Sequence, residues 1–314
     1  MSTTEVSPSA RPQLQGTLRC DHLGVIRVQG EDAAKFLHGQ LTQDFVLLDS
    51  HHARLAAFCS PKGRMQASFI GFKQPDGAIL LVCTRDLLPA TLKRLSMFVL
   101  RAKAQLSDAS QEWAVWGVAG GAVNQALPQT PWSCLHDADG SDWVRLYPGT
   151  GVDRALRVAP TTAAPFDAPA LTLENWQWLE VMSGVVGITQ PIFEAFVPQM
   201  LNFESVDGVN FKKGCYLGQE VVARSQFRGT LKRRAYVVES TGPLMVGQEV
   251  FHVSDAEQPC GLVAAAAPGP SGGWNAVVSM QTSAALGGEL RVGTTADAPS
   301  LTPLPLPYPL LDDI

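Results

Sequence analysis

The sequence predicts an α+β fold in which two lobes face a central cleft and a small antiparallel β-barrel follows at the C-terminus. A strand–helix–strand pattern between residues 25 and 100 starts again at residue 114, which indicates two lobes. Five short strand-like runs at close spacing follow Leu231 and indicate the barrel. The 314 residues therefore divide into an arm at 1–16, the two lobes at 17–230, and the barrel with a proline-rich tail at 231–314.

Apolar spacing places the elements of the first lobe. A short strand at 25–28 ends at Gly30, and an amphipathic helix follows over 31–42. Two strands at 54–59 and 65–72 join through a turn that contains Pro61 and Gly63. A strand at 79–83 and a helix over 86–100 complete this lobe, with Pro89 in the first helical turn, where a missing N–H costs little.

The second lobe repeats this pattern with shorter elements. A strand at 114–118 leads to a helix at 121–127, and runs at 143–146 and 154–158 indicate a hairpin. Residues 159–170 form a loop, and Thr172 can cap a helix that ends at Ser183. A segment marked by Pro191, Pro198 and Asn202 then loops onward.

The last part of the chain changes character. Strand-like runs occur at 235–239, 249–253, 261–265, 276–280 and 289–292, with turn signals such as Gly242-Pro243 and Gly287-Gly288 between them. The tail at 304–309 has too many prolines for a helix, so we expect it to lie extended against the body or to project from it. At the other end, residues 1–16 are polar and predict a disordered arm.

The composition limits which classes of function the protein can have. A formal charge of −5 argues against binding nucleic acid through overall charge, although it leaves open the alternative of a local basic groove. Apolar runs are shorter than the roughly 20 residues of a membrane span, and the start does not resemble a secretory signal. None of the six cysteines has C-x-x-C spacing. We therefore expect a cytoplasmic protein with reduced thiols, no membrane association and no metal site.

One segment, residues 211–234, is basic although the whole chain is acidic. It holds seven of the 24 lysines and arginines but only one acid, Glu220. Residues 213–216 predict a tight turn in which Gly214 is free to take a positive φ, and Gly218 begins a helix. Cys215 would then lie near lysines and a helix N-terminus, which both favour a thiolate. The alternatives are a small buried apolar cysteine and a solvated basic face.

The motif KGCYLGQE at 213–220, followed by Ala223-Arg224 and Arg228-Gly229, resembles the signature of the YgfZ-type folate-binding proteins. These are relatives of the glycine cleavage T protein and are implicated in iron–sulfur enzyme maintenance and tRNA modification. The resemblance extends from about Asp21 to the end of the chain. It implies a T-protein-like fold, with two interleaved lobes around a folate cleft, and a bound tetrahydrofolate or its 5-formyl or methylene derivative.

The resemblance also implies site residues. In the family a tryptophan eight residues before a glycine contacts folate, and Trp176 holds that position before Gly184; core packing is the alternative. A second folate-associated tryptophan is replaced by Leu23. The basic side chains would clamp the glutamate tail of the folate. From the motif we expect Cys215 as the functional thiol and, as folate-binding residues, Lys213, Tyr216, Gln219, Glu220, Arg224 and Arg228. A purely structural alternative pairs Glu220 with Arg224.

Two departures from the T proteins bear on catalysis. T proteins carry a catalytic aspartate just after the turn at 60–64, where this chain has Gln66, Ala67 and Ser68. They also carry a pterin-binding glutamate where this chain has Met182, and Glu180 is nearby in sequence. These departures favour a non-catalytic factor over an aminomethyltransferase.

We therefore expect a monomeric reduced-folate-binding protein that supports iron–sulfur cluster assembly or repair and, through it, tRNA modification. Its partners would be folate, iron–sulfur assembly or client proteins, and tRNA-modifying enzymes. One alternative is a tetrahydrofolate-dependent one-carbon (aminomethyl) transferase. Another is a folate-independent scaffold whose basic segment docks a protein or tRNA.

Overall fold

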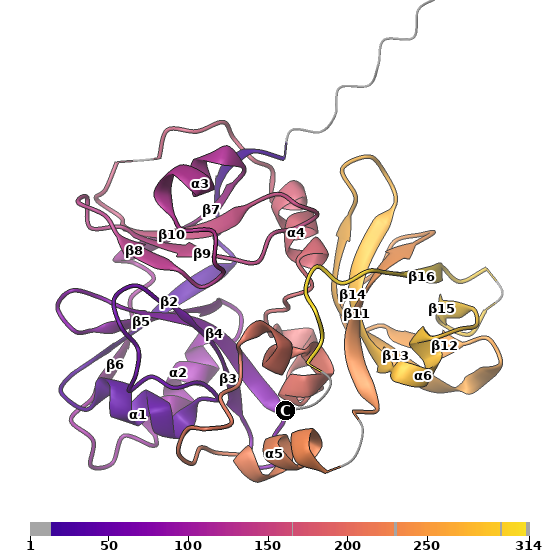
Figure 1. The fold of residues 1–314 in the computed structure, drawn as a ribbon, viewed down its shortest axis with the longest axis horizontal. Helices are drawn as coiled ribbons and strands as arrows, with labels where there is room; N and C mark the ends of the chain where they lie inside the picture. Colours follow the sequence, from indigo (N-terminus) through magenta and orange to yellow (C-terminus); the bar gives the residue numbers. More distant parts are fainter. Residues whose placement is uncertain (1–13, 165, 229–230, 296, 312–314) are drawn as a thin grey trace, which may run out of the picture.

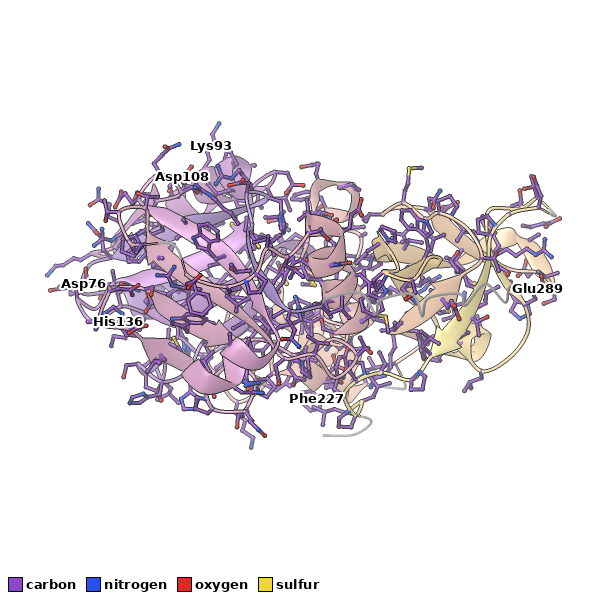
Figure 2. The ribbon with its side chains drawn as sticks, turned by 90° about the horizontal axis from the view of Figure 1, so that it is seen from above. Asp76, Lys93, Asp108, His136, Phe227 and Glu289 are labelled. Atoms are coloured by element: carbon purple, nitrogen blue, oxygen red, sulfur yellow. The ribbon has the colours of Figure 1, made fainter. Side chains whose placement is uncertain are left out.

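A computed structural model describes residues 14–311 except 165, 229–230 and 296. The predicted arm at 1–16 lies outside the described residues as far as position 13, and Gly16 is already the first residue of strand β1 (Gly16–Arg19). The described strands form two five-stranded sheets and a closed six-stranded barrel (Figure 1). Seen from above, Asp76 lies at the outer end of the lobes and Glu289 at the opposite end of the molecule, in the barrel (Figure 2).

The two lobes are interleaved, because the chain starts in one lobe and then enters the other. Strand β1 pairs antiparallel with β7 (Trp113–Ala119) of the second lobe before β2 begins the first lobe. The first sheet has the order β3-β4-β5-β2-β6 and the second β1-β7-β10-β9-β8. The remaining strands of the two sheets are β2 (Leu23–Gln29), β3 (Arg54–Cys59), β4 (Met65–Lys73), β5 (Ile79–Thr84), β6 (Gln105–Asp108), β8 (Cys134–His136), β9 (Asp142–Arg145) and β10 (Arg154–Pro160).

The first sheet is buried on both faces. In β5, Ile79 and Leu81 pack with helices α1 (Ala33–Gln40) and α2 (Leu88–Ser96), whereas Leu80 and Val82 pack toward the second lobe. Successive side chains of a strand point to opposite faces, so an uninterrupted apolar run fits a doubly covered strand.

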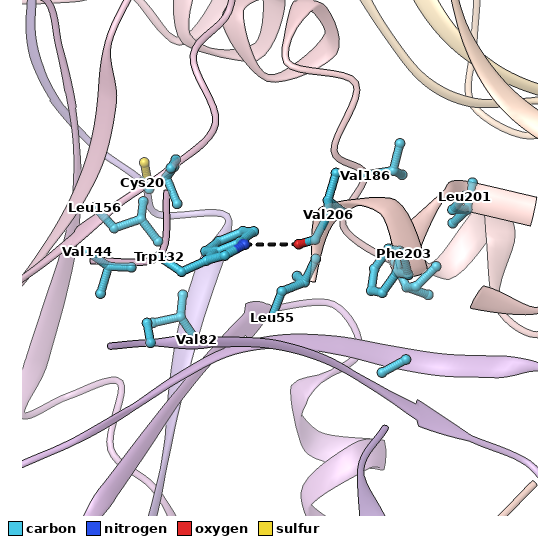
Figure 3. Packing of buried hydrophobic residues seen from close by; sticks show 14 of the residues in the cluster. Cys20, Leu55, Val82, Trp132, Val144, Leu156, Val186, Leu201, Phe203 and Val206 are labelled. Atoms are coloured by element: carbon cyan, nitrogen blue, oxygen red, sulfur yellow. Dashed lines mark hydrogen bonds between the residues drawn. The ribbon is translucent and has the colours of Figure 1, made fainter. Parts of the chain in front are cut away.

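The main core lies between the two sheets. Figure 3 shows Trp132 packed between Val144 and Leu156 of the second lobe and Leu55 and Val82 of the first. On the outer face of the second sheet, the short helix α3 (Gly121–Ala126) covers a smaller apolar cluster.

Helix α4 (Leu173–Met182) connects the lobes to the barrel. The predicted cap is confirmed, because the Thr172 side chain accepts a hydrogen bond from the backbone N–H of Asn175 at 3.2 Å. The indole Nε1 of Trp178 donates to Asn275 Oδ1 in the barrel at 2.8 Å. Three 3₁₀ helices and α5 follow α4 before the barrel: η1 (Gln190–Ile192), η2 (Pro198–Leu201), η3 (Phe203–Val206) and α5 (Gln219–Phe227).

The barrel has one strand more than the five that the sequence predicts. Strand β16 (Ser300–Leu304) immediately precedes the proline-rich tail and closes the barrel by pairing with β11 and β15. Beyond it the tail turns back onto the body, where the buried Tyr308 hydroxyl donates to Gly184 O at 2.8 Å. The other barrel elements are β11 (Arg233–Ser240), β12 (Glu249–His252), β13 (Asp255–Pro268), β14 (Trp274–Gln281), β15 (Leu290–Val292) and the short helix α6 (Thr282–Ala285). No helix within the described ranges is long and apolar enough to span a membrane.

Candidate functional site

A cavity lies between the two lobes, beside the start of β2 and the end of α4. It contains about 650 Å³ of space not occupied by atoms, part of which opens to solvent. Most of its wall is apolar and comes from β2, β3, β4 and β5 on one side and from Trp132, Leu146 and Leu156 on the other. A concave apolar wall with a few polar groups is typical of a small-molecule site.

The charged groups in the cavity wall are Arg154 and Glu180. Their Nη2 and Oε1 atoms are 3.7 Å apart, and Arg154 Nη1 also donates to Tyr147 O at 3.3 Å. Burial lowers the pKa of Arg154 to about 10 and the Glu180 carboxylate opposes this shift, so the guanidinium remains charged at neutral pH. Glu180 keeps 34% of its side chain exposed, which leaves carboxylate surface for a ligand.

The tryptophan predicted to stack on folate lies behind this pair. Trp176 is 0% exposed, and the Arg154 guanidinium carbon lies 4.5 Å from its ring centroid. A β-carbon at Gly117 would be 2.8 Å from the indole ring, so the glycine makes room for Trp176. Trp176 does not line the cavity, whereas the predicted residue Leu23 does. The placement of Trp176 matches the core-packing alternative, and a direct contact with folate stays a prediction.

Besides Phe69 of β4, two aromatic residues that the sequence reasoning missed line the cavity, Trp132 and Tyr147. Trp132 has a left-handed φ of 66° and donates from Nε1 to Val206 O at 2.9 Å (Figure 3). Its ring meets that of Tyr147 edge to face at 5.8 Å, and burial raises the pKa of Tyr147. Both residues lie outside the helices and strands, so no periodic pattern pointed to them.

The positions that depart from the T proteins offer no carboxylate. Ser68 lines the cavity, and its Oγ accepts a hydrogen bond from Ile188 N at 2.9 Å. Gln66 instead donates to Glu194 Oε1 at 2.6 Å. Met182 packs against the main core. Among the described residues that line the cavity, the carboxylate is therefore that of Glu180, which lies two residues before Met182 in α4.

The signature motif lies elsewhere, beside the end of α1, and its last two residues begin α5. Residues 213–228 are not among the described residues that line the cavity. Lys213 is 8% exposed. Its Nζ donates to His38 O and to Leu41 O, the latter at 2.9 Å. The same Nζ lies 4.5 Å from the Tyr216 ring centroid. Burial lowers the pKa of Lys213 to about 8, against the attraction of Asp44 and Cys215. Lys213 therefore anchors the motif to the last turn of α1.

Gly214 does not adopt a positive φ, although glycine would permit it, whereas Gly218 does. Gly218 has a φ of 82° and begins α5, and a β-carbon there would be 2.4 Å from Ser60 O. The hydrogen-bonded turn lies three residues later than predicted, at 216–219, with Gln219 N donating to Tyr216 O at 3.2 Å. Gly63, with a φ of 69°, packs in return against Val221. The hairpin of β3 and β4, which helps to line the cavity, thus meets the motif at its tip (Figure 1).

The remaining predicted residues lie on and around α5. Cys215 is exposed, whereas the other five cysteines of the chain are buried. Arg224 Nη2 donates to Glu220 Oε1 at 2.6 Å, which matches the structural alternative for Glu220, and both side chains are mostly exposed. Arg228 is exposed at the end of the helix, and Gln219 is half-buried at its start. Phe227, which packs edge to face on Phe211, reaches the outer edge of the molecule (Figure 2).

Comparison with known proteins gives a consistent picture. No family model matches the chain. It is 31% identical to the tRNA-modifying protein YgfZ of Klebsiella pneumoniae over 97% of each chain, and 34% identical to that of Enterobacter sp. over 72% of each. Among solved structures, it is similar to the glycine cleavage system aminomethyltransferase T from Bartonella henselae, with a TM-score of 0.66 and 17% identity, over 93% of this chain and 86% of that one. This similarity confirms the predicted T-protein-like fold.

Proposed function

Since the chain belongs to the family of the tRNA-modifying protein YgfZ, we propose that it acts in tRNA modification by binding a reduced folate between its lobes. The observation that carries the proposal is the apolar cavity with Arg154 and Glu180 in its wall. The ligand would be tetrahydrofolate or its 5-formyl or methylene derivative.

The cavity wall suits a pterin. The pterin ring is flat, and one edge presents both N–H donors and a carbonyl acceptor. A carboxylate such as that of Glu180 accepts hydrogen bonds from such donors, and the guanidinium of Arg154 can donate to the carbonyl. The indole of Trp132 and the phenol of Tyr147 would contact the ring faces or edges. These residues would bind and orient the folate and keep water away from the ring.

We propose a folate-dependent factor in preference to an aminomethyltransferase. The catalytic carboxylate expected of a T protein would come from positions 66–68, which hold Gln66, Ala67 and Ser68. The folate-bound protein would support iron–sulfur cluster assembly or repair, and the exposed thiol of Cys215 would serve its protein partners. The exposed Arg224 and Arg228 would bind the carboxylates of a long glutamate tail outside the cavity.

The experiment is a titration of the purified protein with 5-formyltetrahydrofolate, followed by calorimetry and by tryptophan fluorescence. We expect saturable binding that quenches Trp132, and a Trp132→Phe variant that binds with much less quenching. Glu180→Gln removes a charge-assisted contact of about 1.5–3 kcal/mol, so Kd should rise about ten- to hundredfold.

The matched control is Glu174→Gln, since Glu174 is exposed on the first turn of the same helix. It should bind as the unchanged protein does. No saturable binding up to millimolar ligand, or an equal loss in both glutamate variants, would contradict a folate site in this cavity.

A further inference from the structure

The C-terminal tail beyond β16 is anchored to the rest of the protein by the buried side chain of Tyr308. This side chain is 6% exposed, whereas Pro307 and Pro309 on either side of it are exposed. The Tyr308 hydroxyl donates to Gly184 O at 2.8 Å and accepts a hydrogen bond from Asn202 Nδ2 at 3.3 Å. Burial raises the pKa of Tyr308 to about 12, so the hydroxyl keeps its proton and remains a donor at neutral pH.

The tail is held again after Tyr308. Leu311 N donates to Ser205 Oγ at 3.0 Å, and Leu311 O accepts a hydrogen bond from Arg234 Nη2 at 2.5 Å. The same guanidinium donates from Nη1 to the buried Glu204 carboxylate at 2.7 Å. The position of Tyr308 is therefore fixed by the chain around it as well as by its own contacts.

Two contacts of Tyr308 reach the wall of the cavity between the lobes. Ser183 and Val185, on either side of Gly184, line the cavity, so the Tyr308 hydroxyl holds the carbonyl between two lining residues. The Tyr308 ring meets that of Tyr147, which also lines the cavity, edge to face with centroids 5.6 Å apart. Tyr308 is not among the described residues that line the cavity, so it contacts the wall from behind.

The rings of Trp132, Tyr147 and Tyr308 form a row from the cavity to the tail. Tyr147 lies in the middle, with its centroid 5.8 Å from that of Trp132 and 5.6 Å from that of Tyr308. Its backbone oxygen accepts a hydrogen bond from Arg154, whereas its side chain is half-buried. The orientation of the Tyr147 ring therefore depends on its two aromatic neighbours.

We propose that Tyr308 is a positioning residue for the ligand cavity, through which the docked tail fixes the wall at Gly184 and Tyr147. This inference rests on the proposed function, in which the ligand is a reduced folate. A wall that is ordered before binding loses less conformational freedom on binding, so the docked tail raises the affinity for folate. The coupling is reciprocal, so bound folate also holds the tail in place.

The test is the Kd of 5-formyltetrahydrofolate, measured by calorimetry with the full-length chain. Tyr308→Leu removes the ring and the hydroxyl, and Kd should rise about three- to tenfold, the effect of having to order one side chain on binding. Tyr308→Phe keeps the ring against Tyr147, so it should bind more tightly than Tyr308→Leu. A folded Tyr308→Leu variant that binds as the unchanged protein does would overturn the proposal, and equal Kd values in these two variants would overturn the role of the ring.

The matched control is Tyr236→Leu. Tyr236 is a half-buried tyrosine of β11 that packs on the apolar cluster of the barrel and does not line the cavity. The control should lower Tm and leave Kd unchanged. An equal rise in Kd for Tyr236→Leu and Tyr308→Leu would overturn the proposal, because it would mean that loss of stability alone weakens binding.

A measurement on the unchanged protein covers the case in which Tyr308→Leu does not fold. The chain has four tyrosines, so labelling with 3-fluorotyrosine gives four ¹⁹F signals. Tyr147→Phe, Tyr216→Phe and Tyr236→Phe assign three of them, and the fourth belongs to Tyr308. Binding of 5-formyltetrahydrofolate should shift the signals of Tyr147 and Tyr308, and a Tyr308 signal that stays in place while that of Tyr147 moves would overturn the proposal.

Failure of the proposed function gives a different result. In that case 5-formyltetrahydrofolate shows no saturable binding to the unchanged protein and moves no ¹⁹F signal. The protein without ligand then decides the role of Tyr308. Its replacement by leucine should broaden or split the Tyr147 signal, because the ring is left with several orientations. A single narrow Tyr147 signal in folded Tyr308→Leu would overturn the positioning role, whether or not folate binds.

Discussion

Replacement of Gly218 by alanine should destabilise the protein strongly, because this residue meets two separate demands. Its φ of 82° lies in the left-handed region, where an alanine costs about 1–2 kcal/mol. Its β-carbon would also lie 2.4 Å from Ser60 O, and a backbone oxygen cannot move aside as a flexible side chain does. Forcing extra volume into a packed site typically costs about 1–3 kcal/mol. We therefore expect the free energy of unfolding to fall by about 2–5 kcal/mol.

Thermal unfolding followed by circular dichroism measures this loss, which corresponds to a fall in Tm on the order of 10 °C. Gly218→Asn separates the two costs, since asparagine tolerates the left-handed region but keeps the β-carbon. It should recover only the conformational part. Gly214→Ala is the matched control four residues away, because only the His38 ring faces its β-carbon, at 3.3 Å. A Gly214→Ala variant as unstable as Gly218→Ala, or a Gly218→Asn variant as stable as the unchanged protein, would refute this reasoning.

Four further predictions concern single side chains. Trp176→Ala should lower the free energy of unfolding by about 3–5 kcal/mol and Trp176→Phe by clearly less, measured by urea denaturation, because the indole is fully buried; equal and small losses would contradict core packing. The pKa of Lys213 is lowered from 10.5 to about 8, so between pH 8 and pH 10.5 the unfolded chain binds more protons than the folded protein. The free energy of unfolding should therefore rise with pH over this range, and Lys213→Met should flatten the rise in unfolding curves taken at each pH. Arg224→Ala and Arg228→Ala should weaken polyglutamylated folate more than the monoglutamate in calorimetry, and equal losses would exclude a tail clamp. Cys215→Ala should melt as the unchanged protein does, because the side chain is exposed, yet fail to restore iron–sulfur enzyme activity in a deletion strain; full complementation would leave the thiol without a function.

Local patterns were sufficient for most of the fold. The strand predicted at 54–59 is β3 (Arg54–Cys59), and the Thr172 cap begins α4, because side-chain alternation and capping depend on neighbours in the sequence. Strand β16 was not predicted, because it depends on residues that are distant in the sequence. It contains Pro303 and is defined by its pairing with β11, some sixty positions earlier in the chain.

The candidate site depended much more on tertiary structure. The sequence by itself determined the motif, its charge and its cysteine, since these are contiguous. Only the tertiary structure separated the motif from the cavity, and only it brought Trp132, Arg154 and Glu180 together from a loop, a strand and a helix. It also decided which glycine is strained and which tryptophan is buried. Ser60 O lies against Gly218, and Gly117 leaves room for the Trp176 ring. Each of these partners is distant in sequence from the residue that it contacts, so the contacts form only when the backbone packs.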